Sequence, residues 1–428
     1  MSGNLYILTG AAGSGKTTLL NAIVKSKLAV KAPKYSERPS RGPDDDIIHT
    51  DNIENSGCNI IYTINDRRYG INTNLIKEEI EREKDLFVSL SDLRIIRRLK
   101  SELGNRAKAL YISSAIDEKK LEKIQHERHP FAPTEKQKEV LYTLFYRLKS
   151  ASKLEIWPKV VEYMGELVDS WKDALPESRS TEIRQQKIRA FHSRFIDNIA
   201  LFDHVILNYY EPELMTEQAK RIIEYYKNKQ KVETNEKKPV VFMVCAASGA
   251  GKGTLMESLN IMGSQQIAVV SKMGRRAEKE TDKRDGMIAI GPNGEFPPEY
   301  DWRWEFHKGN DFKGIKYAVS TDEIGKNISE NKTQILISNM GQIEKAKEIY
   351  GEHMVFIYLH ATRTEEQIRK YQYESCKTGE EAETRIGEIK KVHEAYIENI
   401  CSFDHVLLNT TYEEDLYDQM FCLIEHYR

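Results

Sequence analysis

The sequence predicts an α/β protein built from two tandem copies of one fold, each a parallel sheet flanked by helices. Two glycine-rich loops follow short apolar strands, at residues 5–18 and 240–254. Two later segments are nearly identical, IDNIALFDHVILN from Ile196 and IENICSFDHVLLN from Ile397, and the order of loop and segment is the same in both halves. Apolar strands alternate with helical patterns throughout, which is typical of parallel sheets.

Length and composition limit the class of protein. A chain of 428 residues has room for two or three domains, at about 100 to 200 residues each. The charge is nearly balanced, with 64 Lys and Arg against 66 Asp and Glu, so bulk electrostatics predicts neither nucleic-acid nor membrane binding. We expect a cytoplasmic protein, because the start lacks a signal-peptide pattern and no apolar run approaches the ~18 residues of a membrane span.

The spacing between matching positions locates where the two halves differ. Matching positions lie 236 to 247 residues apart up to the strand that ends near Tyr111, but only 201 apart in the later repeated segments. The first half therefore carries an insertion of about 46 residues between residues 112 and 184, with helices expected at about 126–180. The matched pairs are Lys16 with Lys252, Gly70 with Gly314, Tyr111 with Tyr358, and Phe202 with Phe403.

A charged stretch at residues 227–239 has the composition of a linker and sets the expected domains, 1–230 and 238–428. Within the insertion, apolar side chains from Trp157 to Trp171 fall at helical spacing and form one stripe. That stripe predicts a helix packing on its own domain, and the alternative is a docking face for a partner protein or a second subunit.

The first glycine-rich loop fits the pattern G-x-x-x-x-G-K-[ST] completely at residues 10–17. Small residues let backbone N–H groups face a phosphate at a helix N-terminus, the lysine adds a cation, and the threonine hydroxyl reaches Mg²⁺. The loop therefore predicts nucleotide phosphate binding, with Thr17 as the metal contact. The predicted phosphate contacts are Gly10, Gly13, Ser14, Gly15, Lys16, Thr17 and Thr18.

The second loop departs from this pattern in two places. Ala246 replaces the first glycine, and Gly253 follows Lys252, so the hydroxyl for Mg²⁺ comes from Thr254. The order G-K-G-T is familiar from nucleoside monophosphate kinases, and both changes keep the loop small. We predict phosphate binding here too, the alternative being a degenerate loop kept for folding. The predicted contacts are Ser248, Gly249, Ala250, Gly251, Lys252, Gly253 and Thr254.

Beyond the loops, the chain resembles the guanylate kinase family twice over. Residues 35–42, YSERPSRG, look like that family's T-T-R-P-P-R-x-G segment. The resemblance implies that Arg38 and Arg41 hold the phosphate of an acceptor nucleotide, a task that suits two guanidinium groups on one loop. In the second half Arg276 and Lys279 keep the spacing, and the lysine, as a point charge, changes the grip on the substrate.

The resemblance extends to the acceptor pocket. Tyr69-Gly70-Ile71 and residues 312–315, with Phe312 first, look like the family's Y-Y-G-T/S element, which lines that pocket. The glutamate that reads guanine in the family has no exact counterpart: Glu305 lies one position off, and Ile60 fills the place in the first half. Residues 306–315 are also similar to the ribose 1,5-bisphosphate phosphokinase family, which implies a sugar phosphate as an alternative acceptor.

The lid should bring cations over the transferred phosphoryl group. In the second half Arg369, Lys370 and residues 377–379 resemble the family's R-x-x-R-G-T lid, and Arg385 matches the arginine that opens the next helix. Arg184 is its repeat partner. In the first half the insertion occupies the lid position, where the candidates Arg128, Arg147 and Arg179 have no assigned place.

Other positions are predicted from the repeat or from the resemblance. Asn208 and Asn409, after the last strand of each half, resemble an asparagine near the adenine end of the donor site. Strand ends Ser89 and Ser338 stand where such kinases show an aspartate, with Asp92 nearby in the first half. The recurring histidine pairs, predicted to support the fold, are His192 with His393 and His204 with His405.

The leading hypothesis is a phosphotransferase that uses ATP and Mg²⁺ to phosphorylate a nucleoside monophosphate such as GMP. The alternatives are a kinase for a sugar phosphate or another small phosphorylated acceptor, with one half possessing no catalysis, and a non-catalytic nucleotide-binding or protein-interaction module. The expected partners are small nucleotides or phosphorylated acceptors, with protein or self-association through the inserted helices. Nucleic acid is not expected, since the basic run from Arg94 to Lys100 reads as a solvated helix face.

Overall fold

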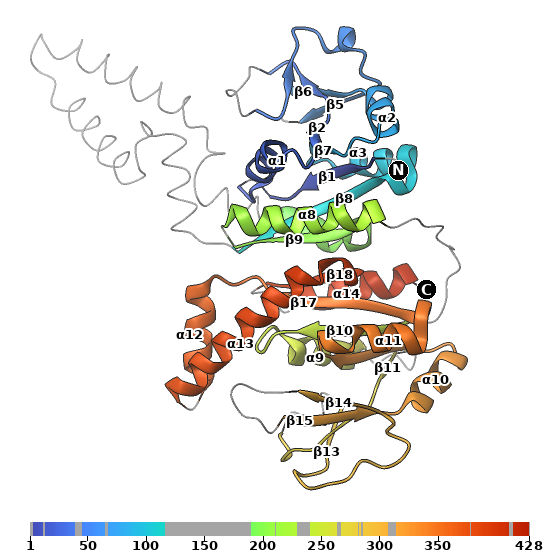
Figure 1. Cartoon of the computed structure of the whole chain (residues 1–428), viewed down its shortest axis with the longest axis vertical. Helices are drawn as coiled ribbons and strands as arrows, with labels where there is room; N and C mark the ends of the chain where they lie inside the picture. Colours follow the sequence, from blue (N-terminus) through green and yellow to red (C-terminus); the bar gives the residue numbers. More distant parts are fainter. Residues whose placement is uncertain are drawn as a thin grey trace, which may run out of the picture. The chain divides into compact units, whose positions relative to one another are not determined.

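The computed structural model describes most of the chain outside the predicted insertion (Figure 1). Contacts divide the chain into two units, Met1–Ala115 with His192–Arg428, and Ile116–Phe191, the second lying almost wholly outside the described residues. The predicted insertion, including Arg128, Arg147, Arg179 and Arg184, therefore falls outside them. The described ranges are 3–11, 13–38, 45–64, 67–115, 190–209, 211–228, 240–262, 267–280, 282–283, 286–306, 314–376, 378–410 and 414–427.

Each half contains one five-stranded parallel sheet with the strand that precedes the glycine-rich loop at its centre. In the first half the order is β2-β7-β1-β8-β9, and in the second it is β11-β16-β10-β17-β18. The strands are β1 (Leu5–Thr9), β2 (Val30–Lys31), β7 (Leu86–Ser89), β8 (Ala107–Ser114), β9 (His204–Asn208), β10 (Val241–Ala246), β11 (Ile267–Val269), β16 (Thr333–Ser338), β17 (Met354–Ala361) and β18 (His405–Asn409).

Helices flank both sheets, as the alternating pattern predicts. In the first half α1 packs on α8 and α3 on β8, and in the second half α14 packs on α9 and β18. The helices are α1 (Lys16–Lys25), α2 (Thr73–Glu81), α3 (Leu93–Leu103), α8 (Pro212–Asn228), α9 (Lys252–Met262), α10 (Thr321–Ser329), α11 (Ile343–Tyr350), α12 (Glu365–Ser375), α13 (Gly379–Glu398) and α14 (Glu414–Tyr427), with short 3-10 turns at Ile53–Ser56, Gly104–Arg106, Ile199–Leu201, Met340–Gln342, Gly351–His353 and Ile400–Ser402.

The central strands are apolar on both faces because helices cover both. All five residues of β1 are buried, and so are the first five of the six in β10. A glutamine locks the last helix of each half to the last strand: Gln218 accepts from the Leu207 N–H at 2.9 Å, and Gln419 accepts from the Leu408 N–H at 2.8 Å. The expectation of two copies of one α/β fold is confirmed at this level. No described helix is long and apolar enough to cross a bilayer.

A smaller four-stranded sheet stands beside each main sheet, with order β4-β3-β6-β5 in the first half and β13-β12-β15-β14 in the second. These sheets carry the segments that resemble an acceptor site. The strands are β3 (Lys34–Ser36), β4 (Ile48–His49), β5 (Ile60–Ile64), β6 (Arg67–Ile71), β12 (Lys272–Gly274), β13 (Met287–Ala289), β14 (Trp302–Phe306) and β15 (Ile315–Val319).

The register of these small sheets corrects one predicted match. Gly70 lies opposite Tyr35 on β3, and in the second half Ala318 lies opposite Met273 on β12, so Ala318 is the counterpart of Gly70 and the match with Gly314 is wrong. Matching the two glycines gave the wrong counterpart, because Gly70 is required by a local packing contact. A Cβ on Gly70 would lie 2.6 Å from the Cys58 sulfur.

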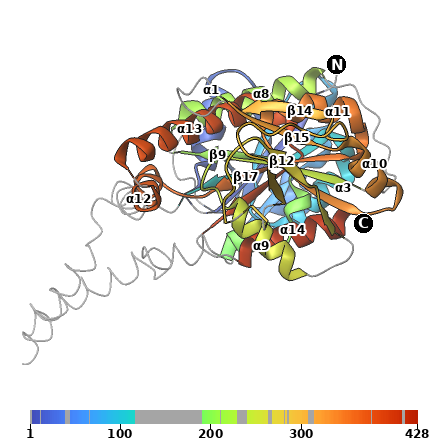
Figure 2. The ribbon, with the colours of Figure 1, turned by 90° about the horizontal axis from the view of Figure 1, so that it is seen from below.

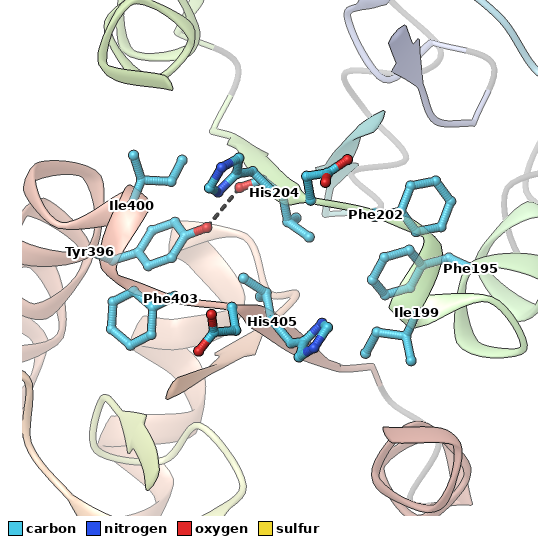
Figure 3. A pocket seen from close by; sticks show the side chains of 12 residues that line it. Phe195, Ile199, Phe202, His204, Tyr396, Ile400, Phe403 and His405 are labelled. Atoms are coloured by element: carbon cyan, nitrogen blue, oxygen red, sulfur yellow. Dashed lines mark hydrogen bonds between the residues drawn. The ribbon is translucent and has the colours of Figure 1, made fainter. Parts of the chain in front are cut away.

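The two repeated segments meet at a small pocket between the two halves (Figure 3). The Tyr396 hydroxyl donates to the Val205 carbonyl across it at 2.7 Å. Each residue that lines the pocket from the first half has a counterpart 201 residues later that lines it from the second half. The two halves therefore face each other with equivalent surfaces. The lining consists of six such pairs: Phe195 with Tyr396, Ile199 with Ile400, Phe202 with Phe403, Asp203 with Asp404, His204 with His405, and Val205 with Val406.

These pairs also explain why the segments repeat. Asp203 accepts from the Ala109 N–H at 2.7 Å, and Asp404 accepts from the Phe356 N–H at 2.8 Å, so each aspartate fixes the last strand against its neighbour. His204 contacts the Tyr226 hydroxyl at 3.0 Å, and His405 contacts that of Tyr427 at 2.8 Å. The interpretation of this histidine pair as fold-supporting agrees with these contacts.

Candidate functional site

Loop 1 (residues 10–17) joins β1 to α1, and its glycines adopt backbone conformations that other residues rarely take. Gly10, Gly13 and Gly15 have φ of 152°, 86° and 97°. A Cβ on Gly10 would lie 2.6 Å from the Ser14 oxygen Oγ, and one on Gly15 would lie 2.9 Å from Asn208 Nδ2. The loop thus has no room for side chains at these positions, as a cradle for a phosphate requires.

Loop 2 (residues 246–254) keeps the same backbone despite its altered sequence. Gly249 and Gly251 have φ of 74° and 107°, at the positions equivalent to Gly13 and Gly15. Ala246 lies at the end of β10, so the absent first glycine leaves the left-handed positions intact. Loop 2 therefore keeps the backbone conformation of loop 1 at these two glycines.

An asparagine holds each loop from the last strand of the same half. Asn208 Nδ2 donates to the Ser14 carbonyl and Asn409 Nδ2 to the Ala250 carbonyl, both at 2.8 Å, and both asparagines are buried. The resemblance implied a place near adenine. The structure places these amides against the loop backbone, where they fix the loop's shape.

The two loop lysines lie over their own loops. Lys16 Nζ donates to the Gly10 and Ala11 carbonyls at 2.7 Å each, and Lys252 Nζ donates to the Ala246 and Ala247 carbonyls at 3.2 and 2.7 Å. Each ammonium is thereby held against the backbone of a loop that opens a helix, α1 or α9. This combination of amide donors, helix N-terminus and cation suits a phosphate.

Buried polar atoms without partners support the same reading. The hydroxyls of Thr9 and Ser14 are buried and have no hydrogen-bond partner among the described residues. A polyphosphate offers acceptors to such donors. Thr17 and Thr18 are exposed in the first turn of α1, and Gly253 and Thr254 are half-buried in that of α9. The described residues include no group of three or more His, Cys, Asp or Glu placed to hold a metal. The Mg²⁺ contacts predicted from the sequence are Thr17 and Thr254.

The predicted acceptor arginines are already bound to carboxylates. Arg38 makes two hydrogen bonds to Asp45, at 2.7 and 2.6 Å, and both side chains are nearly fully buried. In the second half Arg276 pairs in the same two-pronged way with Asp282, and this hydrogen bonding raises the pKa of Arg276. Each arginine is therefore oriented and neutralised by its own loop. Arg41 lies outside the described residues.

A pair of lysines, of which Lys34 is buried and Lys272 half-buried, belongs to this face and was missed at the level of sequence. Lys34 Nζ donates to the Ser89 carbonyl at 2.9 Å and to Asp46 at 2.5 Å. Burial lowers the pKa of Lys34, and the Asp46 charge opposes this shift. Lys272 occupies the equivalent place and donates to the Ile337 carbonyl at 2.9 Å. The signal was available, because each lysine stands four residues before the predicted arginine.

Aromatic side chains line the small sheets beside these cations. Tyr69 stacks on Tyr62 with ring centres 5.6 Å apart, and in the second half Tyr317 lies 5.9 Å from Trp304. The register makes Tyr317 the counterpart of Tyr69. That role was predicted for Phe312, which lies outside the described residues.

Two predicted acceptor residues of the second half point elsewhere. Glu305 is exposed on β14, whose neighbouring Trp304 is buried, and successive strand residues face opposite sides. Glu305 therefore lies on the exposed face of β14, whereas a carboxylate that reads a base must lie on the buried face. Lys279 has an exposed side chain, while its backbone N–H donates to Asp282 at 2.8 Å.

The predicted lid cations are held by acids of the lid helices α12 and α13, which lie side by side (Figure 1 and Figure 2). Arg369 binds Glu383 at 2.7 Å, Lys370 lies 4.0 Å from Glu374, and Arg385 binds Glu381 at 2.8 Å. None of these three bonds reaches loop 2. Lys377 lies outside the described residues.

Other residues of the lid do reach loop 2, and sequence reasoning missed them. Arg363, just after β17, lies over the Tyr371 ring at 4.3 Å and donates to the Gly249 carbonyl at 3.5 Å. Gln372 is fully buried against the loop, and its Oε1 has no partner among the described residues. Together with Ser248 and His393 they line a pocket on loop 2.

The strand ends beside the loops lack a carboxylate, as predicted. Asp92 caps α3, accepting from the Arg94 N–H at 2.9 Å, and the hydrogen bond from the Arg94 side chain lowers its pKa. Ser338 is a strand end whose hydroxyl is buried without a partner among the described residues.

The comparisons with known proteins place this site in a family. The family described as "AAA domain, putative AbiEii toxin, Type IV TA system" matches residues 5–237, more than half of the chain. The chain belongs to this AAA-domain family. Its matched region contains loop 1, so the protein is a P-loop nucleotide-binding protein of the ATP-using kind.

Among solved structures, the guanylate kinase from Anaplasma phagocytophilum is similar at 16% identity, with a TM-score of 0.32, covering 45% of this chain and 87% of that chain. No curated protein matches the chain. The family match, together with loop 1, supports a P-loop fold.

Proposed function

We propose that the protein transfers the γ-phosphoryl group of ATP, in the presence of Mg²⁺, to a small phosphorylated acceptor, with a nucleoside monophosphate such as GMP as the first candidate. One observation carries the proposal. Lys34 is bound to the end of β7, the strand beside β1, which leads into loop 1. Lys272 is bound in the same way to β16, the strand beside β10 and loop 2. Each half thus sets a cation of the small sheet beside its phosphate loop.

Such an arrangement suits phosphoryl transfer, which depends on positioning and charge stabilisation and needs no side-chain nucleophile. Lys16 and Lys252 would bind donor phosphates, with the loop N–H groups. Arg38 and Arg276 would bind the acceptor phosphate beside Tyr69 and its counterpart. Mg²⁺, when bound near Thr17 and Thr254, would neutralise charge on the donor phosphates. In the second half, Arg363 is better placed than the predicted Arg385 to act on the donor phosphates, because Arg363 contacts loop 2 whereas Arg385 binds Glu381.

Two classes of acceptor are proposed, a nucleoside monophosphate and a sugar phosphate or other small phosphorylated molecule. The exposed Glu305 leaves no described carboxylate in the predicted guanine-reading place of the second half, which favours a sugar phosphate or another small phosphorylated acceptor there. The two halves also differ at their acceptor loops and lids. The same residues therefore fit a protein in which one half only binds nucleotide and the other half catalyses the transfer.

ATP hydrolysis without an acceptor is the second candidate function. The Arg38–Asp45 and Arg276–Asp282 pairs favour it, because the acceptor arginines are neutralised before any phosphate arrives. An acceptor phosphate would have to displace a buried carboxylate or bind beside it, and this weakens its binding.

A coupled assay of ADP formation by the full chain separates these functions. We expect ADP to form from ATP and Mg²⁺ only when one member of a panel of nucleoside monophosphates and sugar phosphates is added. Asp45→Asn should lower the KM for that acceptor, since it releases Arg38, and the double variant Lys16→Ala, Lys252→Ala is the blank. ADP formation that no acceptor stimulates would reject transfer and support hydrolysis.

A further inference from the structure

The first half contributes an aromatic side chain to the surroundings of loop 2. Tyr209, which follows β9, stacks on His393 of α13 with ring centres 5.3 Å apart and an angle of 24°. It also meets His360 of β17 edge-on at 5.8 Å. The Tyr209 hydroxyl is buried and has no hydrogen-bond partner among the described residues, so the ring carries the contact.

One of the two histidines lines the pocket on loop 2, and the other lies directly beside it. His393 lines the pocket on loop 2 with Gly249 and Gln372. His360 is buried beside it, with ring centres 5.1 Å apart. Burial lowers the pKa of His393 to about 4, and that of His360 well below its usual range. Both rings are therefore neutral near pH 7, and the contact with Tyr209 is an aromatic packing contact that needs no charge.

The same tyrosine is tied to loop 1 through its neighbour in the chain. Asn208, the residue before it, donates to the Ser14 carbonyl of loop 1 at 2.8 Å. Asn208 is also the last residue of β9, paired with Ser114 of β8. One short, continuous path therefore runs from loop 1 through Asn208 and Tyr209 to His393 and the pocket on loop 2.

A second path leads from loop 2 to the first half and is built differently. Asn409 donates to the Ala250 carbonyl of loop 2, and the next residue, Thr410, donates to Asp415. Asp415 in turn lies 3.7 Å from His192 of the first half. Burial lowers the pKa of His192. A neutral histidine at 3.7 Å gives a weaker contact than the stacked ring of Tyr209, so of these two contacts between the halves the one through Tyr209 is the stronger.

We propose that Tyr209 is a positioning residue of the second nucleotide site and that, through it, nucleotide at loop 1 strengthens nucleotide binding at loop 2. The inference rests on the proposed binding of ATP at both loops. A nucleotide that orders loop 1 also orders Asn208 and Tyr209, so loop 2 binds its own nucleotide with less ordering cost. Coupling energies between sites correspond to about 5- to 150-fold changes in affinity, and the effect must be reciprocal.

Calorimetry of the full chain with a non-hydrolysable ATP analogue and Mg²⁺ tests this. Lys16→Ala leaves loop 2 as the binding site, and Lys252→Ala leaves loop 1. We expect the analogue to bind loop 2 at least 5-fold more tightly in the wild-type chain than in Lys16→Ala. Adding Tyr209→Ala should reduce this ratio to below about 2-fold, while the affinity of loop 1 in the Lys252→Ala background stays within about 2-fold.

The matched control is Tyr396→Phe, which removes a hydrogen bond between the two halves but touches neither loop; the ratio should survive it. Tyr209→Leu, which keeps apolar volume without the ring, provides a second variant should the alanine protein fail to fold. Equal affinities of loop 2 in wild type and Lys16→Ala, or a ratio that persists in Tyr209→Ala and Tyr209→Leu, would overturn the coupling alone. No binding at either loop would overturn the proposed function as well.

Discussion

At the scale of single residues, the phosphate loops depend on a few positions where backbone and side chain meet closely. Gly15 and Gly251 are left-handed, and each faces the amide of an asparagine from the last strand of its half. The asparagine and the glycine therefore act as a pair: the amide can hold the loop only because no Cβ intervenes. This explains why both members occur in both halves while Gly10 is replaced by Ala246.

Gly251→Ala should abolish nucleotide binding at loop 2, because the added Cβ would lie 2.2 Å from Asn409 Nδ2 at a φ of 107°. A loss of affinity beyond 100-fold is expected by calorimetry, which corresponds to about 2.7 kcal/mol. Gly325→Ala is the matched control, since a Cβ at that α10 position meets nothing within 4 Å. Retained binding in Gly251→Ala would show that loop 2 does not hold the phosphates.

At the scale of elements, helix α12 brings the lid of the second half onto its loop. The helix begins with a capping box, in which Thr364 accepts from the Gln367 N–H and Gln367 accepts from the Thr364 N–H. Two turns later its Tyr371 and Gln372 lie against Gly249. The start of the helix therefore sets the position of the side chains that cover loop 2.

Thr364→Ala should destabilise α12 by about 1 kcal/mol and weaken nucleotide binding at loop 2 several-fold. Ser320→Ala removes the equivalent cap of α10, where the serine accepts from the Glu323 N–H at 3.2 Å, and is the matched control. Both variants should lose similar stability in thermal melts, but only the first should change the affinity measured by calorimetry. Equal affinities in the two variants would argue against α12 as part of the site.

At the scale of the whole molecule, two equivalent halves share one face but carry different sites. The pocket between them is lined by six pairs at a constant spacing of 201 residues, which makes the contact symmetric. The sites at the loops are not symmetric, since Lys279 replaces the second arginine and the first half carries the insertion. A division of labour between the halves follows as a hypothesis.

Lys16→Ala and Lys252→Ala should therefore reduce turnover of the full chain very unequally, by more than 100-fold for the active loop and by 10-fold or less for the other. The reason is that each lysine serves only the donor phosphates of its own loop. Steady-state ADP formation under identical conditions measures both. Equal losses would mean that both halves turn over or that catalysis needs both together.

The sequence by itself determined the two copies, the central loop strands and the phosphate loops, because these features rest on local backbone demands: glycines at left-handed positions and apolar runs for strands covered on both faces. It also located Arg38 through the resemblance of residues 35–42 to a guanylate kinase segment, and Arg276 through the same spacing in the second half. Only the tertiary structure placed Lys34 beside Ser89, matched Tyr69 with Tyr317, and set Tyr209 of one half against His393 of the other. Such contacts join residues far apart in the chain, and no local pattern encodes which buried side chains will meet there.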